Sequence, residues 1–204
     1  MRITLAIPTN RGVQPKTMQC LLELVAHGGY DWHIVVASEG YTIAENRTYL
    51  AVQALKNKSG YLLFIDDDMT FEPDLLDTLI ANEKEIVGTA YHSRGNVDTM
   101  PKYLDTGITA IAEVAPKEYI DLEKNDDPKY KDTFECFAVG TGIMLIKCEV
   151  FEKVPRPWFA FEFYESGQVK LGEDWYFCRE AKKVGYKIYT DPKPKIGHLG
   201  EIIY

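Results

Sequence analysis

Two hydrophobic patterns alternate along the first half of the chain, and this alternation limits the possible folds more than any other feature. Short apolar runs are typical of buried strands, and the stretches between them carry apolar residues at helical spacing. The expected strands are 3–8, 32–37, 61–65 and 85–90, and the expected helices are 15–26, 42–58 and 73–81. Strands and helices in this order form a mainly parallel sheet with helices on both faces.

The second half of the chain is less regular. Residues 92–135 are polar and interrupted by glycine and proline, which indicates a solvated excursion with a hairpin. The next expected segments are an apolar stretch at 137–147, an aromatic loop at 154–172, a helix at 173–184 and a strand at 186–190. We therefore predict one α/β domain over residues 1–204, with a mainly parallel central sheet, flanking helices and a smaller antiparallel element.

Charge and cysteine usage exclude several classes of function. The 204 residues include 23 Lys and Arg against 31 Asp and Glu, a formal net charge of -8, so no nucleic-acid polymer is expected as a partner. A small anionic ligand would need local cations or a metal ion. No apolar run approaches the roughly 20 residues that span a bilayer. The cysteines form no C-x-x-C pair, so we expect free thiols and a cytoplasmic location.

Three consecutive carboxylates, Asp66, Asp67 and Asp68, follow the wholly apolar strand 61–65. Ligands of such sheets bind beyond the carboxyl ends of the strands, which is where these side chains should lie. Adjacent carboxylates repel one another in a partly desolvated crevice, and a divalent cation with oxygen ligands removes that repulsion. The sequence therefore predicts a metal site after the third strand rather than a solvated acidic turn.

Two protein families carry an acidic motif in such a position. The motif resembles the D-x-D of GT-A glycosyltransferases, which holds Mn²⁺ or Mg²⁺ against a nucleotide diphosphate. It also matches the D-x-D-x-T of haloacid dehalogenase-like phosphatases, with Asp66 and Asp68 as the functional pair and Thr70 in the last position. Those phosphatases carry the motif on the first strand of their core, whereas here it follows the third. The phosphatase is an alternative, and the remaining motifs favour the glycosyltransferase.

Further segments resemble the family-2-like GT-A glycosyltransferases in the expected order. The stretch 3–11 resembles their first strand and nucleotide-contacting loop. Glu39 lies where these enzymes often have an acidic residue that faces the base, and residues 46–47 lie where they often have an Asn-Arg pair near the nucleotide. Helical spacing places Arg47 on the apolar side of its helix near the N-terminus, a position that favours an anion. The resemblance implies nucleotide and donor contacts from Pro8, Thr9, Arg11, Glu39, Asn46, Arg47, Asp66 and Asp67.

Glycines and a histidine in the second half extend this resemblance. The stretch 139–146 resembles the glycine-rich strand that passes beneath the donor sugar, because glycine permits close backbone approach. The resemblance implies that Gly140, Thr141 and Gly142 contact the donor. His198 falls after the final expected strand, where enzymes of this fold often recruit a third metal ligand.

An acidic pair at 173–174 resembles the x-E-D motif of the family at a helix N-terminus. The resemblance implies that Glu173 and Asp174 are catalytic. Neighbouring helical residues point about 100° apart, so only one carboxylate can face the acceptor directly. We expect Asp174 to be the base that deprotonates the acceptor hydroxyl.

The resemblance implies a transferase that moves a sugar from a nucleoside-diphosphate sugar to an unidentified acceptor hydroxyl. UDP-glucose or UDP-galactose is the favoured donor, and GDP-mannose is the next choice. Mn²⁺ or Mg²⁺ would be held by Asp66, Asp68 and His198. Acceptor contacts are expected from Trp158, Tyr164 and Trp175.

The resemblance also divides the chain into a nucleotide-binding half, about 1–91, and an acceptor-binding half, about 92–204. Compact enzymes of this fold occur in large viruses and phages as well as in bacteria. The expected cytoplasm would then be that of a bacterium or of an infected host. A non-catalytic nucleotide-sugar binding module, which would not need Asp174, is the other alternative.

Overall fold

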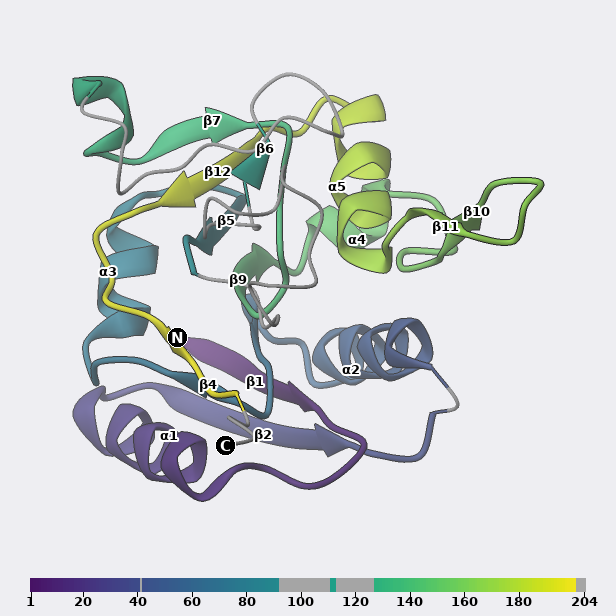
Figure 1. Cartoon of the computed structure of the whole chain (residues 1–204). Coiled ribbons are helices and arrows are strands. Elements are labelled where there is room, and N and C mark those ends of the chain that lie inside the picture. Colours follow the sequence, from purple (N-terminus) through teal and green to yellow (C-terminus); the bar gives the residue numbers. More distant parts are fainter. Residues whose placement is uncertain (41, 92–110, 113–126, 201–204) are drawn as a thin grey trace, which may run out of the picture.

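A seven-stranded sheet forms the centre of the computed structural model (Figure 1). The structure describes residues 1–40, 42–91, 111–112 and 127–200. The strands are β1 (Arg2–Pro8), β2 (Asp31–Ala37), β3 (Tyr61–Ile65), β5 (Ile86–Thr89), β7 (Phe134–Cys136), β9 (Ile143–Lys147) and β12 (Ile188–Asp191), in the spatial order β2-β1-β3-β9-β5-β12-β7. β9 and β7 are antiparallel to their neighbours and the other strands share one direction, so the predicted mainly parallel sheet is confirmed.

Helices cover both faces of this sheet (Figure 1). They are α1 (Pro15–His27), α2 (Ile43–Lys56), α3 (Leu75–Ala81), α4 (Val150–Lys153) and α5 (Glu173–Lys183). Side chains alternate along β3: Leu63 and Ile65 join the apolar cluster of α1 and α3, whereas Leu62 and Phe64 join that of α2, α4 and α5. A strand buried on both faces needs apolar residues at every position, which explains the uninterrupted run at 61–65.

The start of α2 shows how a local pattern positions a functional residue. The Thr42 side chain accepts a hydrogen bond from the Glu45 backbone N–H, and the Glu45 carboxylate accepts one from the Thr42 N–H at 2.9 Å. These reciprocal bonds form the capping box that the sequence predicts, and they begin the helix at Ile43. The first turn of α2 therefore delivers Asn46 and Arg47, both buried, to the edge of the sheet.

β9 is the main departure from the expected topology. It lies between β3 and β5 and runs antiparallel to both. The sequence predicts an apolar segment there, but an apolar run such as 143–146 does not specify its partners or its direction. The antiparallel direction brings the preceding residues 140–142 to the carboxyl end of β3, where the Asp66 N–H donates to the Gly142 carbonyl at 2.9 Å.

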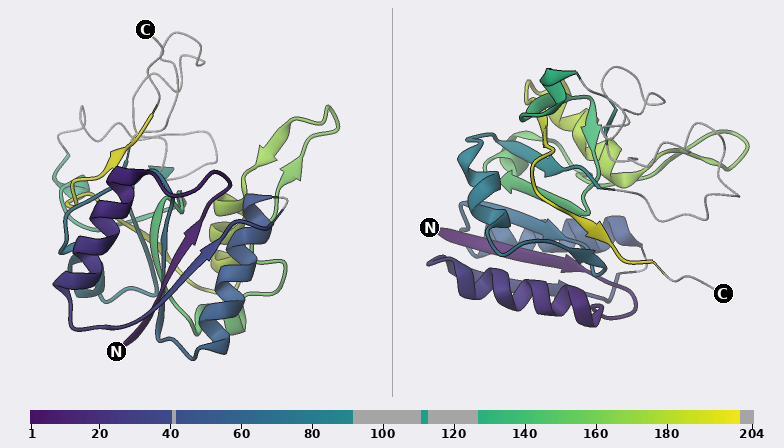
Figure 2. Two further views of the ribbon diagram at one scale, coloured as in Figure 1. Left: turned by 90° about the horizontal axis from the view of Figure 1, so that it is seen from below. Right: turned by 60° about the vertical axis from the view of Figure 1, so that its left-hand side comes forward.

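Three small antiparallel pairs surround the main sheet, as the predicted antiparallel element requires. β4 (Met69–Thr70) pairs with β13 (Gly197–His198), β6 (Ile111–Ala112) pairs with β8 (Ala138–Val139), and β10 (Glu162–Phe163) pairs with β11 (Val169–Leu171). The expected aromatic loop thus contains a hairpin, which projects from the body of the molecule (Figure 2). Of the segment 92–135, in which a hairpin is expected, the structure describes β6, a short 3₁₀ helix at Pro128–Tyr130 and the start of β7; most of the rest lies outside the described residues.

The cysteines and the lengths of the helices bear on two further predictions. All four cysteines are buried and free, which confirms the expected thiols. Within the described ranges, no helix combines the length and apolar character needed to span a bilayer.

Candidate functional site

Segments that are distant in the sequence meet at the carboxyl edge of the sheet. The loops after β1, β2 and β3 lie there, and β9 begins there because it runs antiparallel to β3. The segment after β12 returns along this edge until β13 pairs with β4, directly after the three carboxylates (Figure 1). The carboxylates of 66–68 are thereby placed where the sequence predicts a ligand site.

Arg47 is the buried cation of the site, with only 3% of its surface exposed. Its Nη2 lies 3.0 Å from Asp66 Oδ1, and its Nε lies 3.3 Å from Glu173 Oε1. Nη1 lies 3.5 Å from the Thr141 carbonyl oxygen, and the guanidinium stands 5.5 Å from the Phe64 ring centroid. Arg47 thus joins the carboxylate after β3 to the start of α5.

Burial and neighbouring charges shift the pKa values of Arg47 and Asp66. Burial lowers the pKa of Arg47, but Asp66, Glu173 and Asp174 outweigh it, so the pKa lies above its ordinary value and the cation persists. Burial raises the pKa of Asp66, and the Arg47 charge opposes that rise without cancelling it. Arg47 therefore compensates carboxylates that would otherwise repel one another in a desolvated place.

The other two carboxylates face different partners. Asp67 accepts a hydrogen bond from the Thr9 hydroxyl, in the loop after β1. Asp68 Oδ1 lies 3.3 Å from His198 Nε2, and the Leu199 N–H donates to the Asp68 carbonyl at 2.8 Å. The three consecutive acids are therefore divided among α2, the β1 loop and the C-terminal segment.

Most of the expected donor-binding residues line one cavity of about 270 Å³. The lining residues are Pro8, Thr9, Asn10, Arg11, Gly12, Gln14, Ile43, Arg47, Asp66, Asp67, Asp68 and Glu173. Arg11 is exposed at this cavity, so it offers a positive charge beside the acidic wall.

A second cavity of about 370 Å³ lies after β2 and contains the expected base-facing residue Glu39. Asn46 lines it as well, but only 2% of Asn46 is exposed. The Asn46 side-chain oxygen accepts the Gly40 N–H at 2.8 Å, and its amide nitrogen lies 3.4 Å from Asn10 Oδ1. Asn46 thus ties the loops after β1 and β2 together, which sequence reasoning did not predict.

The glycine-rich turn before β9 packs against Tyr91, a residue that the sequence analysis did not single out. The Gly142 N–H donates to the Tyr91 hydroxyl at 3.0 Å. Burial, Asp66 and Asp174 raise the pKa of Tyr91 above its ordinary value. The available signal was positional, because Tyr91 lies just after β5 at the carboxyl edge of the sheet.

Glu173 and Asp174 point to different surroundings, as the helical geometry predicts. Glu173 lines the 270 Å³ cavity and pairs with Arg47. The Asp174 Oδ1 accepts the Trp175 N–H at 2.8 Å, and its Oδ2 lies beside Gly140. Burial raises the pKa of Asp174 from its ordinary 3.8 to about 7; Glu173 adds to the rise, and Arg47 opposes it. Asp174 therefore has a pKa suited to exchanging a proton near neutral pH.

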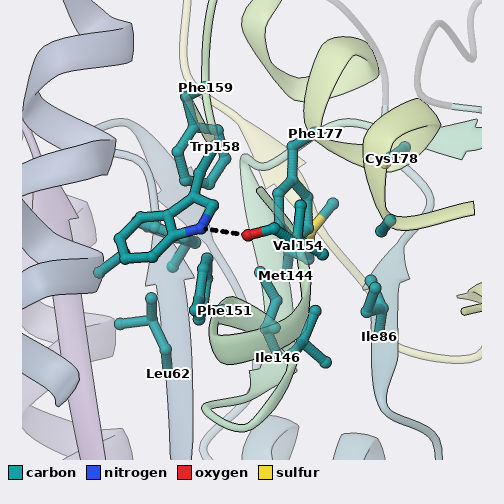
Figure 3. Packing of buried hydrophobic residues seen from close by; sticks show 14 of the residues in the cluster. Leu62, Ile86, Met144, Ile146, Phe151, Val154, Trp158, Phe159, Phe177 and Cys178 are labelled. Atoms are coloured by element: carbon teal, nitrogen blue, oxygen red, sulfur yellow. Dashed lines mark hydrogen bonds between the residues drawn. The ribbon is translucent and has the colours of Figure 1, made fainter. Parts of the chain in front are cut away.

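The structure separates the three aromatic residues expected to contact an acceptor. Trp158 is 2% exposed and lies in the core, where its indole N–H donates to the Val154 carbonyl at 3.0 Å (Figure 3). The expectation that Trp158 contacts an acceptor is wrong, because the ring has no open surface. Tyr164 is 44% exposed at the end of the hairpin. Trp175 is half-buried in the first turn of α5, with its ring 6.2 Å from that of Phe137.

The structure brings together fewer metal ligands than the sequence predicts. In the part of the chain that the structure describes, no three His, Cys, Asp or Glu side chains are grouped to hold a metal ion. Asp66 is instead ion-paired with Arg47. Asp68 and His198 do lie together, and a carboxylate oxygen with an imidazole nitrogen is a pair that Mn²⁺ accepts. Two protein ligands are fewer than a divalent cation needs, so the remaining ligands would have to come from a bound molecule or water.

No protein-family model matches the chain, and no curated protein matches it either. Solved structures do match over nearly its whole length. A197 from STIV is 19% identical with a TM-score of 0.64, covering 98% of this chain and 87% of its own. The structure of GalNAc-T7 with UDP, GalNAc and Mn²⁺ is 11% identical with a TM-score of 0.62. The match covers 99% of this chain and 44% of the GalNAc-T7 chain. TarS of S. aureus is 15% identical with a TM-score of 0.51, and the match covers 97% of this chain and 60% of the TarS chain.

These likenesses and the sheet order define an α/β protein with a GT-A-like fold. The chain spans less than two thirds of the GalNAc-T7 and TarS chains, and most of A197. The acidic motif follows the third strand of the sheet rather than the first. The fold therefore gives no support to the phosphatase alternative.

Proposed function

We propose that the chain is a metal-dependent glycosyltransferase that moves a sugar from a nucleoside-diphosphate sugar, with a UDP-sugar favoured, to an acceptor hydroxyl. One observation carries the proposal: the carboxylates of 66–68 line one cavity at the carboxyl end of β3, with Asp68 beside His198, in a GT-A-like fold. The similar structure of GalNAc-T7, which contains UDP, GalNAc and Mn²⁺, supports this choice. The buried free cysteines suit a reducing compartment, and we place the protein in the cytoplasm.

The acidic cavity would repel a bare diphosphate, so the donor is expected to bind together with a cation. Asp68 and His198 would hold Mn²⁺ or Mg²⁺. The bound metal would supply Lewis-acid stabilisation of the departing diphosphate. Arg11 offers a further charge for a phosphate oxygen, and Asp67, held by Thr9, offers an acceptor for a ribose hydroxyl.

Asp174 is the residue best suited to take the proton of the acceptor hydroxyl. Its raised pKa makes the carboxylate a stronger base than an ordinary aspartate. Glu173 is engaged by Arg47, so its role is to hold that cation rather than to move a proton. Among the predicted acceptor contacts, Tyr164 and Trp175 remain as proposals.

UDP is expected to bind more tightly when Mn²⁺ is present, because the metal must screen the carboxylates from the diphosphate. Titration calorimetry with UDP and with GDP, each with and without Mn²⁺, measures this dependence. We expect UDP in Mn²⁺ to bind at least about tenfold more tightly than UDP without metal. Equal binding with and without Mn²⁺, or no binding of either nucleotide, would contradict the proposal.

The turnover of the donor should rise as the pH increases through about 7, because Asp174 must lose its proton to act as the base. A pH profile of kcat/KM measures this, and the Asp174→Asn variant should lose turnover while it keeps UDP and Mn²⁺ binding. Unchanged turnover in that variant removes Asp174 as the base. If the natural protein binds the sugar donor but does not turn it over, it is instead a binding module.

The same residue predicts a pH dependence of stability. The folded-state pKa is raised above its ordinary 3.8, so the stabilisation from protonated Asp174 is complete below about pH 4 and is lost as the pH rises through about 7. Asp174→Asn, which cannot ionise, should therefore gain stability relative to the natural protein as the pH rises from about 4 to above 7. Urea unfolding at several pH values tests the sign, and an equal pH dependence in both proteins contradicts it.

A further inference from the structure

Tyr91 occupies the space above the glycine-rich turn. A Cβ atom added to Gly142 would lie 2.6 Å from Tyr91 Cζ, and one added to Gly140 would collide with the Tyr91 hydroxyl. A Cβ atom does not approach another heavy atom this closely, so both positions need glycine while the ring lies there. The turn is therefore shaped around Tyr91 in this structure.

The Tyr91 hydroxyl is connected to the buried charges through this turn. It accepts the Gly142 N–H at 3.0 Å, and the Gly142 carbonyl accepts the Asp66 N–H at 2.9 Å. The Thr141 carbonyl between the two glycines lies 3.5 Å from Arg47 Nη1. Movement of the turn would thus disturb Asp66 and Arg47, both of which line the 270 Å³ cavity.

The Tyr91 ring has a second contact, with His198. The two ring centroids lie 5.5 Å apart and the ring planes are at 90°, an edge-to-face arrangement. His198 is carried by the two-residue strand β13, which pairs with β4, and its Nε2 lies 3.3 Å from Asp68 Oδ1. The ring of Tyr91 therefore helps to hold the imidazole beside Asp68.

We propose that Tyr91 is a positioning residue with two separable actions: its ring holds His198 beside Asp68, and its hydroxyl holds the Gly140–Gly142 turn against Asp66. The second action would set the cavity wall that receives the diphosphate, and this part rests on the proposed function. Substitution of residues that orient metal ligands commonly changes metal affinity by about tenfold or more.

The two actions are distinguished by Tyr91→Phe, which keeps the ring, and Tyr91→Leu, which removes it. The affinity for Mn²⁺ alone can be measured by the loss of the free-ion electron paramagnetic resonance signal. Tyr91→Phe should bind Mn²⁺ with an affinity within about twofold of that of the natural protein, and Tyr91→Leu about tenfold more weakly. With UDP in saturating Mn²⁺, Tyr91→Phe should bind about five- to tenfold more weakly, because the Gly142 N–H loses its acceptor. Tyr189→Leu is the matched control, since its half-buried ring contacts Lys84 in another part of the sheet.

The His198 imidazole resonance provides a measurement that needs no ligand. In protein with isotope-labelled histidine, we expect the His198 signal to shift in Tyr91→Leu and to stay in place in Tyr91→Phe. If the natural protein binds neither Mn²⁺ nor UDP, the proposed function fails, and the His198 signal still tests the action of the ring. Tyr91 is not a positioning residue if Tyr91→Leu leaves both the His198 signal and the Mn²⁺ affinity unchanged while the unfolding midpoint is normal.

Discussion

Replacement of Arg47 by methionine is expected to lower the free energy of unfolding by about 2–4 kcal/mol near neutral pH. The substitution keeps much of the side-chain volume but leaves Asp66 and Glu173 close together without the cation that now lies between them. The Asp66 side chain is 28% exposed, so water can stabilise part of its unpaired charge. The expected loss of stability is therefore smaller than for a fully buried ion pair. Urea unfolding followed by tryptophan fluorescence gives the value.

Arg179 provides the control for this prediction. Its guanidinium also contacts two carboxylates, Glu162 at 2.7 Å and Glu180 at 2.8 Å, but 27% of its side chain is exposed. Arg179→Met should therefore cost no more than about 1 kcal/mol. The double variant Arg47→Met with Asp66→Asn should regain part of the lost stability, since one of the two repelling charges is gone. Equal losses in Arg47→Met and Arg179→Met would show that burial of the Arg47 cluster does not set the cost.

Replacement of Asp68 by asparagine is expected to reduce Mn²⁺-dependent turnover by about 100- to 1,000-fold, or roughly 3–4 kcal/mol in activation free energy. Asparagine has almost the same shape, so the fold should be kept while the carboxylate beside His198 is lost. The measurement is release of UDP from the sugar donor, with hydrolysis by water as the reaction if no acceptor is known. This prediction depends on the proposed function, unlike the Arg47 result.

Asp74→Asn is the matched control for the Asp68 variant. Asp74 is also an aspartate, exposed before α3, and its side chain makes no capping hydrogen bond. Its substitution should leave turnover within about twofold and the unfolding midpoint unchanged. Turnover in Asp68→Asn within about threefold of the natural protein would remove Asp68 from the metal site.

Local features of the fold and site could be predicted from the sequence with good accuracy. The strand 61–65 has the predicted bounds, and the capping box of Thr42 and Glu45 forms as the spacing indicates. Both depend on interactions within a few residues, namely side-chain burial on a regular period and the first hydrogen bonds of a helix. The position of Asp66 at the carboxyl edge follows directly from the strand that precedes it.

Partners that come from distant segments could not be predicted in the same way. The sequence indicates that Arg47 needs an anion, but the structure pairs it with Asp66 and Glu173, two carboxylates that also line the cavity. Trp158 illustrates the same limit, because an aromatic residue in an irregular segment suits a core or a binding surface equally well. Only the packing around α4 and α5 decides that it is buried.

Three features follow from the amino-acid sequence: the α/β class, the order of the early strands and helices, and the place of the acidic motif after a buried strand. Three other features emerge only in the folded molecule: β9 lies between β3 and β5, Tyr91 packs on the glycine turn, and the three acids face Arg47, Thr9 and His198. The difference lies in how far apart in the sequence the interacting residues are. Periodic burial and helix capping are properties of neighbouring residues, whereas strand order and ion-pair choice depend on how the whole core packs.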